Sequence, residues 1–391
     1  MAISRRFDIW KLELRQYRSI EACDVQLGPL SLVVGPNGSG KSNFVDSLRF
    51  VAQALNESLD NALRERGGVG EVRRRSGGRP THLGVEVFFN GDDFSGQFGF
   101  QVGAAKGGDF KVTYEHCYVM GPTGTFHYEI RGGKVQASAG VVVPKVTDDR
   151  LLLVALSGQE AFRPVFDGLA GINVFSLNPD SMRALQKPDA GDLLKRDGSN
   201  VASVLDQLRR SDPALKTRIE DYLRLIVPGI ESVARRNLGG WETLEFRQRS
   251  DGASSTWTFP ATSMSDGTLR VLGILVALFA PSGPDLAPVV IEEPETALHP
   301  AGAGLLLDAI RSASRTRQVI ATTHSPDLLD SPDLRPEEII AVRSDGGRSV
   351  IARLDAPGFA AIRESLYTPG ELLRVDQLQP AEPHNGTELS A

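Results

Sequence analysis

The chain has 391 residues, of which 41% are hydrophobic and 24% charged, and its net charge is −6. This balance is typical of a globular protein of one to three domains. It excludes a disordered chain, a collagen-like chain and a strongly basic nucleic-acid coat. The most apolar runs, 151–156 and 271–280, are too short to cross a bilayer. The opening residues do not resemble a secretory signal, and Cys23 and Cys117 form no spacing motif. We therefore expect a cytoplasmic protein with no membrane partner.

The first half of the chain predicts strands around one helix. Residues 9–20 alternate in hydrophobicity and predict a strand, and the apolar residues 30–34 predict a short buried strand. A glycine-rich stretch follows, and apolar side chains then recur at helical spacing. Residues 64–80 are rich in Gly and Arg and predict a surface loop, and 83–147 predict short antiparallel strands broken by Gly-rich turns.

The second half of the chain predicts more helix than the first half. Residues 181–237 have a helical pattern, and a polar, Pro-rich tail from about residue 379 predicts disorder. The other predicted elements are two strands within 241–260, an apolar helix over 268–280, buried strands at 288–291 and 318–323, a helix at about 300–314 between them, and a hairpin over 337–353.

The glycine-rich stretch after the first buried strand matches a phosphate-binding motif. The run Gly35-Pro36-Asn37-Gly38-Ser39-Gly40-Lys41-Ser42 matches G-x-x-x-x-G-K-[ST] in full, between a predicted strand and a predicted helix. Glycines let successive backbone N–H groups face inward and cradle phosphate oxygens, and the helix adds its positive end. Lys41 then reaches the β- and γ-phosphates, and the Ser42 hydroxyl binds Mg²⁺. A glycine-rich turn with a surface lysine is the alternative, which the strand–helix context disfavours.

A second apolar strand ends in carboxylates. Residues 288–291 run directly into Glu292 and Glu293, and acids at the tip of a buried strand suit the ligand crevice of an α/β sheet. We predict that Glu292 holds Mg²⁺ and that Glu293 positions or deprotonates the attacking water. Glu295 is expected at the surface or in a supporting position. Taken alone, these acids could equally be a solvated strand end.

Polar residues at one more strand end and at one helix start are further candidates for phosphate contact. His324 ends the next apolar strand, where it could bond a γ-phosphate or the attacking water, although a lone His is more often a satisfied polar residue. Ser265, Asp266 and Gly267 precede the apolar helix of 268–280. Ser and Asp are ordinary N-cap residues, and a capped helix N-terminus beside a glycine is also an anion site.

These pieces, in this order, resemble an ABC-type P-loop ATPase of the RecF/SMC-like branch. The glycine loop resembles its Walker A motif, MSDGT at 264–268 its signature motif, VVIEEPETALHP at 289–300 its Walker B, catalytic glutamate and D-loop, and His324 its switch histidine. Tyr17-Arg18 matches the aromatic–arginine pair of the branch's opening strands. The resemblance implies that Arg18 and Asn43 lie beside the nucleotide.

The resemblance also implies a mechanism. Two chains enclose two ATP molecules, and each Walker A faces Ser265, Asp266 and Gly267 of the partner subunit. ATP closes the homodimer and hydrolysis opens it. Glu292 stands where an Asp is usual and extends the carboxylate by about 1.5 Å, which suits slow turnover. His299 replaces the usual D-loop acid, and no counterpart of the Q-loop glutamine stands out.

Arginines are the candidates for nucleic-acid contact. They cluster in the Gly-rich stretch, as Arg64, Arg66, Arg73, Arg74, Arg75 and Arg79, and again as the pair Arg235-Arg236. Phosphate contacts need such cations, and Arg73, Arg74, Arg75 and Arg79 are the predicted DNA contacts. A solvated surface loop is the alternative.

The predicted fold is α/β: an ABC-type ATPase head with a mostly parallel central sheet, an antiparallel β region and an inserted helical lobe. The expected parts are the N-terminal half of the head (1–62), the β region (63–150), the helical lobe with return strands (151–260), the C-terminal half of the head (261–378) and the tail (379–391). The predicted function is a Mg²⁺-dependent, homodimeric ATPase that acts on DNA in repair or genome maintenance. The alternative is a regulatory ATPase of a bacterial defence or toxin system that controls a separate effector protein.

Overall fold

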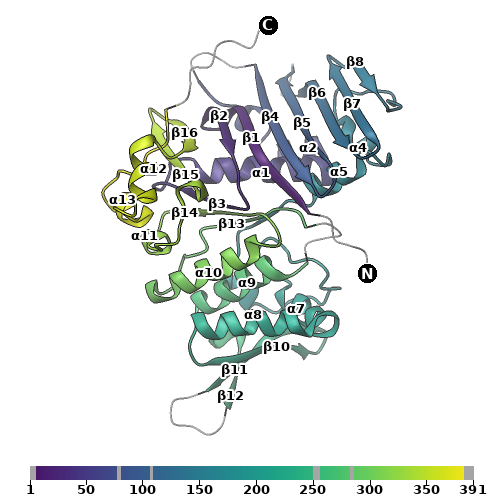
Figure 1. Cartoon of the computed structure of the whole chain (residues 1–391). Coiled ribbons are helices and arrows are strands. Elements are labelled where there is room, and N and C mark those ends of the chain that lie inside the picture. Colours follow the sequence, from purple (N-terminus) through teal and green to yellow (C-terminus); the bar gives the residue numbers. More distant parts are fainter. Residues whose placement is uncertain (1–5, 77–80, 106–108, 250–255, 282–285, 383–391) are drawn as a thin grey trace.

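The structure is a computed structural model that describes residues 6–76, 81–105, 109–249, 256–281 and 286–382 (Figure 1). Within these residues, 13 strands form one mixed sheet in the order β8-β7-β6-β5-β4-β1-β2-β16-β15-β3-β14-β13-β9. A second, antiparallel sheet has the order β10-β11-β12. Strands from both ends of the chain therefore meet in one layer.

The centre of the large sheet is parallel, as the sequence predicts. Its parallel strands are β15 (Ile339–Asp345), β3 (Leu30–Val34), β14 (Val319–Thr323), β13 (Val289–Glu292) and β9 (Asn173–Phe175). On β3, Leu32 and Val34 belong to one hydrophobic core and Val33 to the other. Burial on both faces explains why these strands are continuous apolar runs in the sequence.

An antiparallel wing extends this centre. It consists of β1 (Phe7–Tyr17), β2 (Ile20–Gln26), β4 (His82–Gly91), β5 (Ser95–Ala104), β6 (Phe110–Gly121), β7 (Gly124–Arg131) and β8 (Lys134–Ala139). β4 pairs with β1, with Val87 opposite Leu12, and β16 (Arg348–Arg353) joins β2 to β15. The β region predicted for 83–147 is thus a continuation of the central sheet, because β1 offers a hydrogen-bonding edge on each side.

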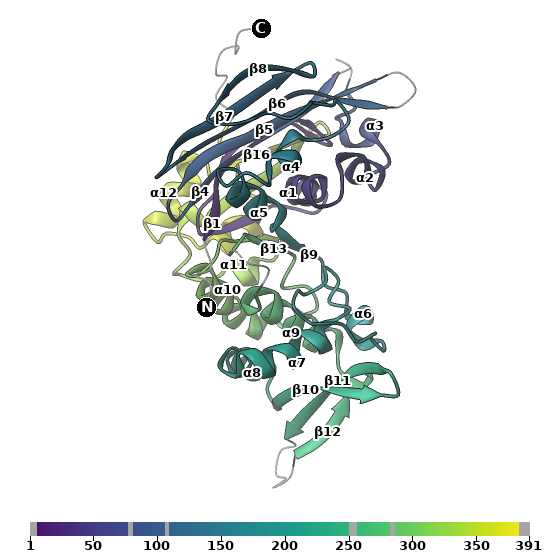
Figure 2. The same ribbon diagram turned by 90° about the vertical axis from the view of Figure 1, so that its right-hand side faces the viewer.

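Helices cover the inner face of this wing (Figure 2). They are α1 (Lys41–Asn56), α2 (Leu59–Arg64), α3 (Val69–Val72), α4 (Leu152–Leu156) and α5 (Arg163–Ala170). The surface loop predicted for 64–80 is wrong in part, because α3 forms there and Arg66 is buried. Residues 77–80 lie outside the described residues.

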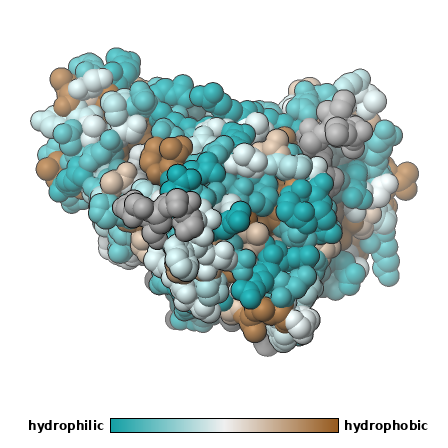
Figure 3. Space-filling view, turned by 90° about the horizontal axis from the view of Figure 1, so that it is seen from below, coloured by the Kyte–Doolittle hydropathy of each residue, from teal (hydrophilic) through white to brown (hydrophobic). Residues whose placement is uncertain are grey.

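A lower lobe packs on the other face of the parallel strands. It contains α6 (Pro179–Arg183), α7 (Val201–Ser211), α8 (Pro213–Ile226), α9 (Asp266–Phe279), α10 (Ala303–Ser314), β10 (Ile230–Leu238), β11 (Trp241–Arg249) and β12 (Thr256–Pro260). The helical pattern predicted to reach residue 237 ends earlier, since β10 begins at Ile230. Seen from below, the surface is mostly hydrophilic with separate hydrophobic patches (Figure 3).

The C-terminal part contains the short helices α11 (Pro326–Leu329), α12 (Ala356–Arg363) and α13 (Pro369–Arg374), and α13 packs against α11. The disorder predicted from residue 379 is wrong for residues 379–382, because Pro380 bridges to Leu354 and the Ala381 N–H donates to the Arg353 carbonyl. Residues 383–391 lie outside the described residues. Cys23 and Cys117 are both buried free thiols. In the described part of the chain, no helix has the length and apolarity needed to cross a membrane.

Candidate nucleotide site

The phosphate loop lies between β3 and α1, where the sequence predicts it. Gly40 precedes α1 with a φ of 112°, and a Cβ there would lie 2.0 Å from Ser349 Oγ, so glycine is required. The Ser349 hydroxyl donates to the Ser39 carbonyl (2.7 Å), which fixes the loop to β16. The Ser39 hydroxyl is buried and has no partner among the described residues. A buried donor left free in this loop suits a bound anion.

Lys41 lies inside the loop. Its side chain is buried, and its Nζ donates to the carbonyl oxygens of Gly35 (2.8 Å) and Pro36 (3.1 Å). Burial lowers the pKa of Lys41, and the charges of Glu293 and Glu295 oppose that shift. The phosphate-loop lysine and the acids after β13 are therefore electrostatic neighbours, although about 250 positions separate them in the sequence.

The acids after β13 meet His324 at the end of β14. The His324 Nδ1 lies 3.5 Å from Oε1 of Glu293 and 3.7 Å from Oε1 of Glu295. Glu293 has a left-handed φ of 46°, and its N–H is held by the carbonyl and hydroxyl oxygens of Thr322. Lys41, Glu293 and His324 thus converge at the ends of three adjacent parallel strands.

Glu295 takes the supporting position, which is one of the two positions expected for it. It is 9% exposed rather than a surface residue, and its Oε1 accepts bonds from the Thr323 hydroxyl (2.6 Å) and the His324 N–H (3.2 Å). Its Oε2 is buried without a partner among the described residues. Glu295 therefore fixes the turn that carries His324.

Glu292 lies on the α1 side of the strand tip. Its Oε1 is 3.7 Å from Nη2 of Arg196. Burial raises the pKa of Glu292, while the charges of Arg196 and Arg49 oppose that shift. Ser42 lies seven positions before Arg49, on the same face of α1.

These residues fit a magnesium ion that a P-loop nucleotide would bring. Among the described residues, no group of three or more His, Cys, Asp or Glu is arranged to hold a metal. Mg²⁺ beside a nucleotide usually keeps waters and phosphate oxygens and takes only one or two protein ligands. The exposed Ser42 hydroxyl and the Glu292 carboxylate are the two protein ligands that would hold the ion here.

The signature residues begin α9. Ser265 caps the helix, and its Oγ accepts from the Thr268 N–H (3.2 Å). A Cβ on Gly267 would lie 2.4 Å from the Ala297 carbonyl oxygen, so glycine lets the helix approach the D-loop. Arg183 of α6 pairs with Asp266. In the described part of this single chain, no hydrogen bond or ion pair joins these residues to the phosphate loop.

Sequence reasoning missed Arg270. Its guanidinium donates to the carbonyl oxygens of Leu177 (3.3 Å), Glu292 (3.4 Å) and Glu293 (3.3 Å). It therefore joins the signature helix to the strand tip that carries the acids. Its signal was a single charge inside the apolar run 269–280, where an unpaired cation would be costly.

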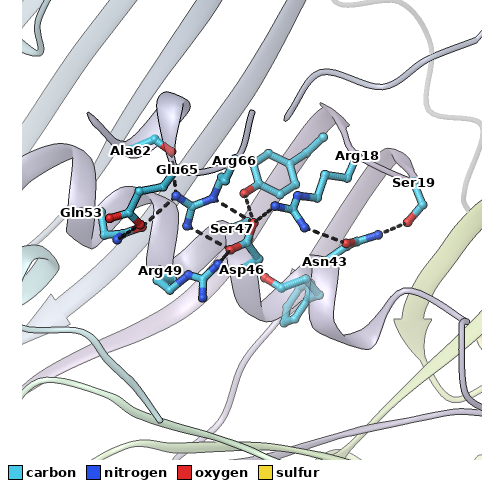
Figure 4. Close-up of polar contacts among 12 residues, drawn as sticks. Arg18, Ser19, Asn43, Asp46, Ser47, Arg49, Gln53, Ala62, Glu65 and Arg66 are labelled. Atoms are coloured by element: carbon cyan, nitrogen blue, oxygen red, sulfur yellow. Dashed lines mark hydrogen bonds and ion pairs between the residues drawn. The ribbon is translucent and has the colours of Figure 1, made fainter. Parts of the chain in front are cut away.

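Arg18 and Asn43, which the resemblance places beside the nucleotide, bond to each other and to other residues of the chain. Arg18 Nη1 donates to Asn43 Oδ1 (3.5 Å), and Nη2 lies 3.0 Å from Oδ2 of Asp46 (Figure 4). Asp46 also pairs with Arg49 and with the buried Arg66. Asp46 was missed because its partners lie in three separate segments, and a single acid in a helix carries no motif.

The predicted DNA contacts are mostly paired. Arg74 lies 3.3 Å from Glu21, Arg75 pairs with Glu71, and Arg73 donates to the Thr81 carbonyl oxygen (3.4 Å). Arg79 lies outside the described residues. Among the other clustered arginines, the Arg66 side chain is only 2% exposed and cannot reach a ligand surface as a free cation. Arg64, Arg235 and Arg236 pair with Asp60, Asp206 and Glu245, respectively.

The phosphate loop, the parallel strands around it and the acids at the strand tips together define a P-loop nucleotide-binding fold. Residues 30–110 and 176–330 match the family described as "AAA domain, putative AbiEii toxin, Type IV TA system". These ranges make up more than half of the chain, and the chain belongs to this family.

One curated relative is similar to most of the chain. The OLD nuclease of Thermus scotoductus is 23% identical over 365 residues, which cover 87% of this chain and 63% of that protein. The chain thus spans less than two thirds of the length of this curated relative.

Among solved structures, an Smc head bound to the C-winged helix domain of ScpA has a TM-score of 0.55 at 16% identity, covering 90% of this chain and 98% of that chain. The Smc head of Pyrococcus furiosus, with an extended coiled coil and bound to the C-terminal domain of ScpA, also has a TM-score of 0.55, at 15% identity over 92% of this chain and 99% of that chain. At these identities the likeness concerns the fold.

Proposed function

We propose that the chain hydrolyses ATP with Mg²⁺ and that ATP drives two copies into a closed homodimer that acts on DNA. The observation that carries this proposal is the convergence of Lys41, Glu293 and His324 at the tips of β3, β13 and β14. A phosphate-binding lysine, a carboxylate base and a hydrogen-bonding imidazole at one crevice are the parts that phosphoryl transfer to water needs.

Each residue has a distinct role in the proposed reaction. Lys41 leaves the loop carbonyls and binds the β- and γ-phosphates. Ser42 and Glu292 hold Mg²⁺, which when bound neutralises phosphate charge. A water molecule attacks the γ-phosphorus, the bond to the bridging oxygen of ADP breaks, and Glu293 takes a proton from the water. His324 hydrogen-bonds the γ-phosphate, and Glu295 fixes its turn.

The dimer follows from the placement of the signature. Ser265 and Gly267 lie at the start of α9, a 14-residue helix whose positive end is suited to a phosphate. Because no hydrogen bond or ion pair joins them to the phosphate loop of their own chain in the described residues, we propose that they complete the site of the partner subunit. ATP would then tie the two chains together, and its hydrolysis would release them.

The DNA part of the proposal is supported by the relatives. The OLD nuclease, which is 23% identical to this chain, is named for an activity on nucleic acid. The acidic balance of the whole chain requires that a DNA contact be local.

A second candidate function has its own support. The family description names a toxin system, which favours a regulatory ATPase that controls a separate effector. DNA that stimulates ATP turnover and loses this effect as salt rises would favour the first proposal over the second.

The test uses Glu293→Gln, which keeps the size of the side chain and removes the base. We expect turnover to fall by about 10²–10⁴-fold, while ATP converts the variant into a stable dimer in light scattering. Lys41→Ala should abolish ATP binding and remain monomeric. A Glu293→Gln chain that stays monomeric at saturating ATP would refute the closed dimer.

A further inference from the structure

A hollow beside the Walker A helix is lined by arginines. Arg18, Arg66, Arg73 and Arg75, together with Glu71, surround a volume of about 430 Å³. We name it the arginine hollow. With Asp46 behind it, four guanidinium groups meet two carboxylates, so the hollow has an excess of positive charge. Cationic hollows of this size favour a phosphate group.

Asp46 has more donors than it needs. Its Oδ2 accepts from the Tyr17 hydroxyl (2.8 Å) and Arg66 Nε (3.0 Å) and lies 3.0 Å from Arg18. Its Oδ1 accepts from Arg66 Nη2 (2.9 Å) and from Arg49. An ionised carboxylate has about four acceptor sites, so Asp46 stays satisfied when one donor leaves.

Arg18 is the donor that is free to leave. Its side chain is 31% exposed, against 2% for Arg66, and its buried Nε has no partner among the described residues. Its backbone is held in the left-handed region, with a φ of 48° and its N–H bonded to the Val72 carbonyl (2.7 Å). Such a conformation costs of order 1 kcal/mol and often marks a functional position.

Arg18 also begins a hydrogen-bonded path to the phosphate loop. Arg18 donates to Asn43, and the Asn43 amide donates to the Ser19 hydroxyl (2.6 Å). Ser19 bonds Ser349 (2.7 Å), whose hydroxyl donates to the Ser39 carbonyl (2.7 Å). Figure 4 shows the Arg18, Asn43 and Ser19 part of this path along α1. A movement of Arg18 can therefore be transmitted through these hydrogen bonds to the phosphate loop.

We propose that the arginine hollow binds a backbone phosphate of DNA. When the phosphate binds, Arg18 leaves Asp46 and bonds to the phosphate, and this movement changes the position of the Walker A helix. The choice of DNA rests on the proposed function. Arg73 has no carboxylate partner among the described residues, and Arg75 pairs with an exposed glutamate, so both are available to a ligand at the rim. The buried Arg66 stays with Asp46 and keeps α1 in place.

The first experiment measures binding without nucleotide. A fluorescent DNA duplex is titrated into the full chain and into Arg73→Ala/Arg75→Ala, at several salt concentrations. We expect the variant to bind roughly tenfold more weakly and the slope of log affinity against log salt to fall by about 1, because the hollow neutralises one backbone phosphate.

The matched control is Arg224→Ala/Arg249→Ala. These arginines line another hollow, of about 560 Å³, on the lower lobe, and they pair with Asp221 and Glu231. Their loss should leave duplex affinity unchanged. Wild-type affinity and slope in Arg73→Ala/Arg75→Ala would overturn the arginine hollow as a DNA site. A matching loss of ATP affinity in that variant would instead assign the hollow to the nucleotide.

The second experiment tests whether Arg18 couples DNA binding to ATP binding. Duplex DNA should change the affinity of the wild-type chain for ATP by a factor of about 5 or more, and ATP should change duplex affinity by the same factor. Arg18→Ala should bring this factor towards one, and a factor unchanged from wild type would overturn the role of Arg18. A wild-type chain that dimerises with ATP but never binds the duplex overturns this inference and leaves the ATP-driven dimer intact.

Discussion

Two buried carboxylates on the same side of the large sheet are stabilised in opposite ways. Asp46, on the Walker A helix, is surrounded by three arginines. Glu115, on β6 of the wing, accepts from the Tyr128 hydroxyl (2.8 Å) and from the N–H groups of Leu152 (2.7 Å) and Leu153 (2.9 Å). Charged arginines stabilise the carboxylate of Asp46, whereas neutral hydrogen-bond donors contact the carboxyl group of Glu115.

The pKa values follow this difference. For Asp46, burial would raise the pKa, but the hydrogen bonds and charge of Arg66, with Arg49 and Arg18, lower it overall. For Glu115, burial outweighs the donors from the backbone and Tyr128 and raises the pKa to about 7. The comparison teaches that burial is compatible with a charged side chain on the Walker A helix and with a neutral one in the wing, according to the hydrogen-bond and charge partners.

The largest expected effect is on Asp46. Asp46→Ala leaves the buried Arg66 without its carboxylate and should lower the free energy of unfolding by about 3–5 kcal/mol. Urea unfolding measures this loss. The double variant Asp46→Ala/Arg66→Met should recover part of it, and a double variant no more stable than Asp46→Ala would contradict the charge-pairing explanation.

Glu115 should produce a smaller, pH-dependent effect. Below its unfolded pKa near 4.5, Glu115 is protonated in both states. As pH rises towards 7, the unfolded chain ionises while the folded chain stays neutral, so stability falls by up to about 3 kcal/mol. Unfolding free energies at pH 5, 6, 7 and 8 should show this slope in wild type and a reduced slope in Glu115→Gln. Asp46 acts in the opposite direction, since its contribution is lost only as pH falls through its lowered pKa.

Two tyrosines sharpen the comparison. Tyr17 donates to Asp46 and Tyr128 to Glu115, both at 2.8 Å and both from buried rings. Tyr128→Phe removes one of three donors and should cost about 2 kcal/mol at pH 8, where Glu115 is charged. Tyr17→Phe removes one of five contacts and should cost about 0.5–1 kcal/mol. Equal losses in urea unfolding would show that donor number is not what separates the two regions.

The smallest effect concerns Arg196. Its exposed guanidinium faces Glu292 at 3.7 Å, so Arg196→Ala should free the carboxylate and lower the Mg²⁺ concentration needed for tight ATP binding by about two- to threefold. Fluorescent-nucleotide titration at fixed Mg²⁺ concentrations measures the change. Arg210→Ala, whose guanidinium pairs with Asp206 on the lower lobe, is the control and should leave the Mg²⁺ requirement unchanged.

Much of the fold was predictable from local pattern. The phosphate loop is eight consecutive residues, and the parallel strands are short apolar runs, so both are visible without long-range contacts. Asp46, Arg270 and Arg196 were not predicted, because each acts through residues from other elements. The wing was expected as a separate β region, but its link to the centre is the β1–β4 pairing, which no motif records.

The order of the large sheet sets when the nucleotide site can form. β3, which is followed by the phosphate loop, pairs with β14 and β15, whose paired residues lie 289 and 307 positions further along the chain. During synthesis, the strand before the loop therefore has no partner until most of the chain has been made. Long-range pairing of this kind slows folding, and any ligand that binds only the finished site stabilises only completed molecules. Under the proposed function, ATP is then a folding ligand as well as a substrate, and it favours chains in which the strands of the first and last thirds have paired.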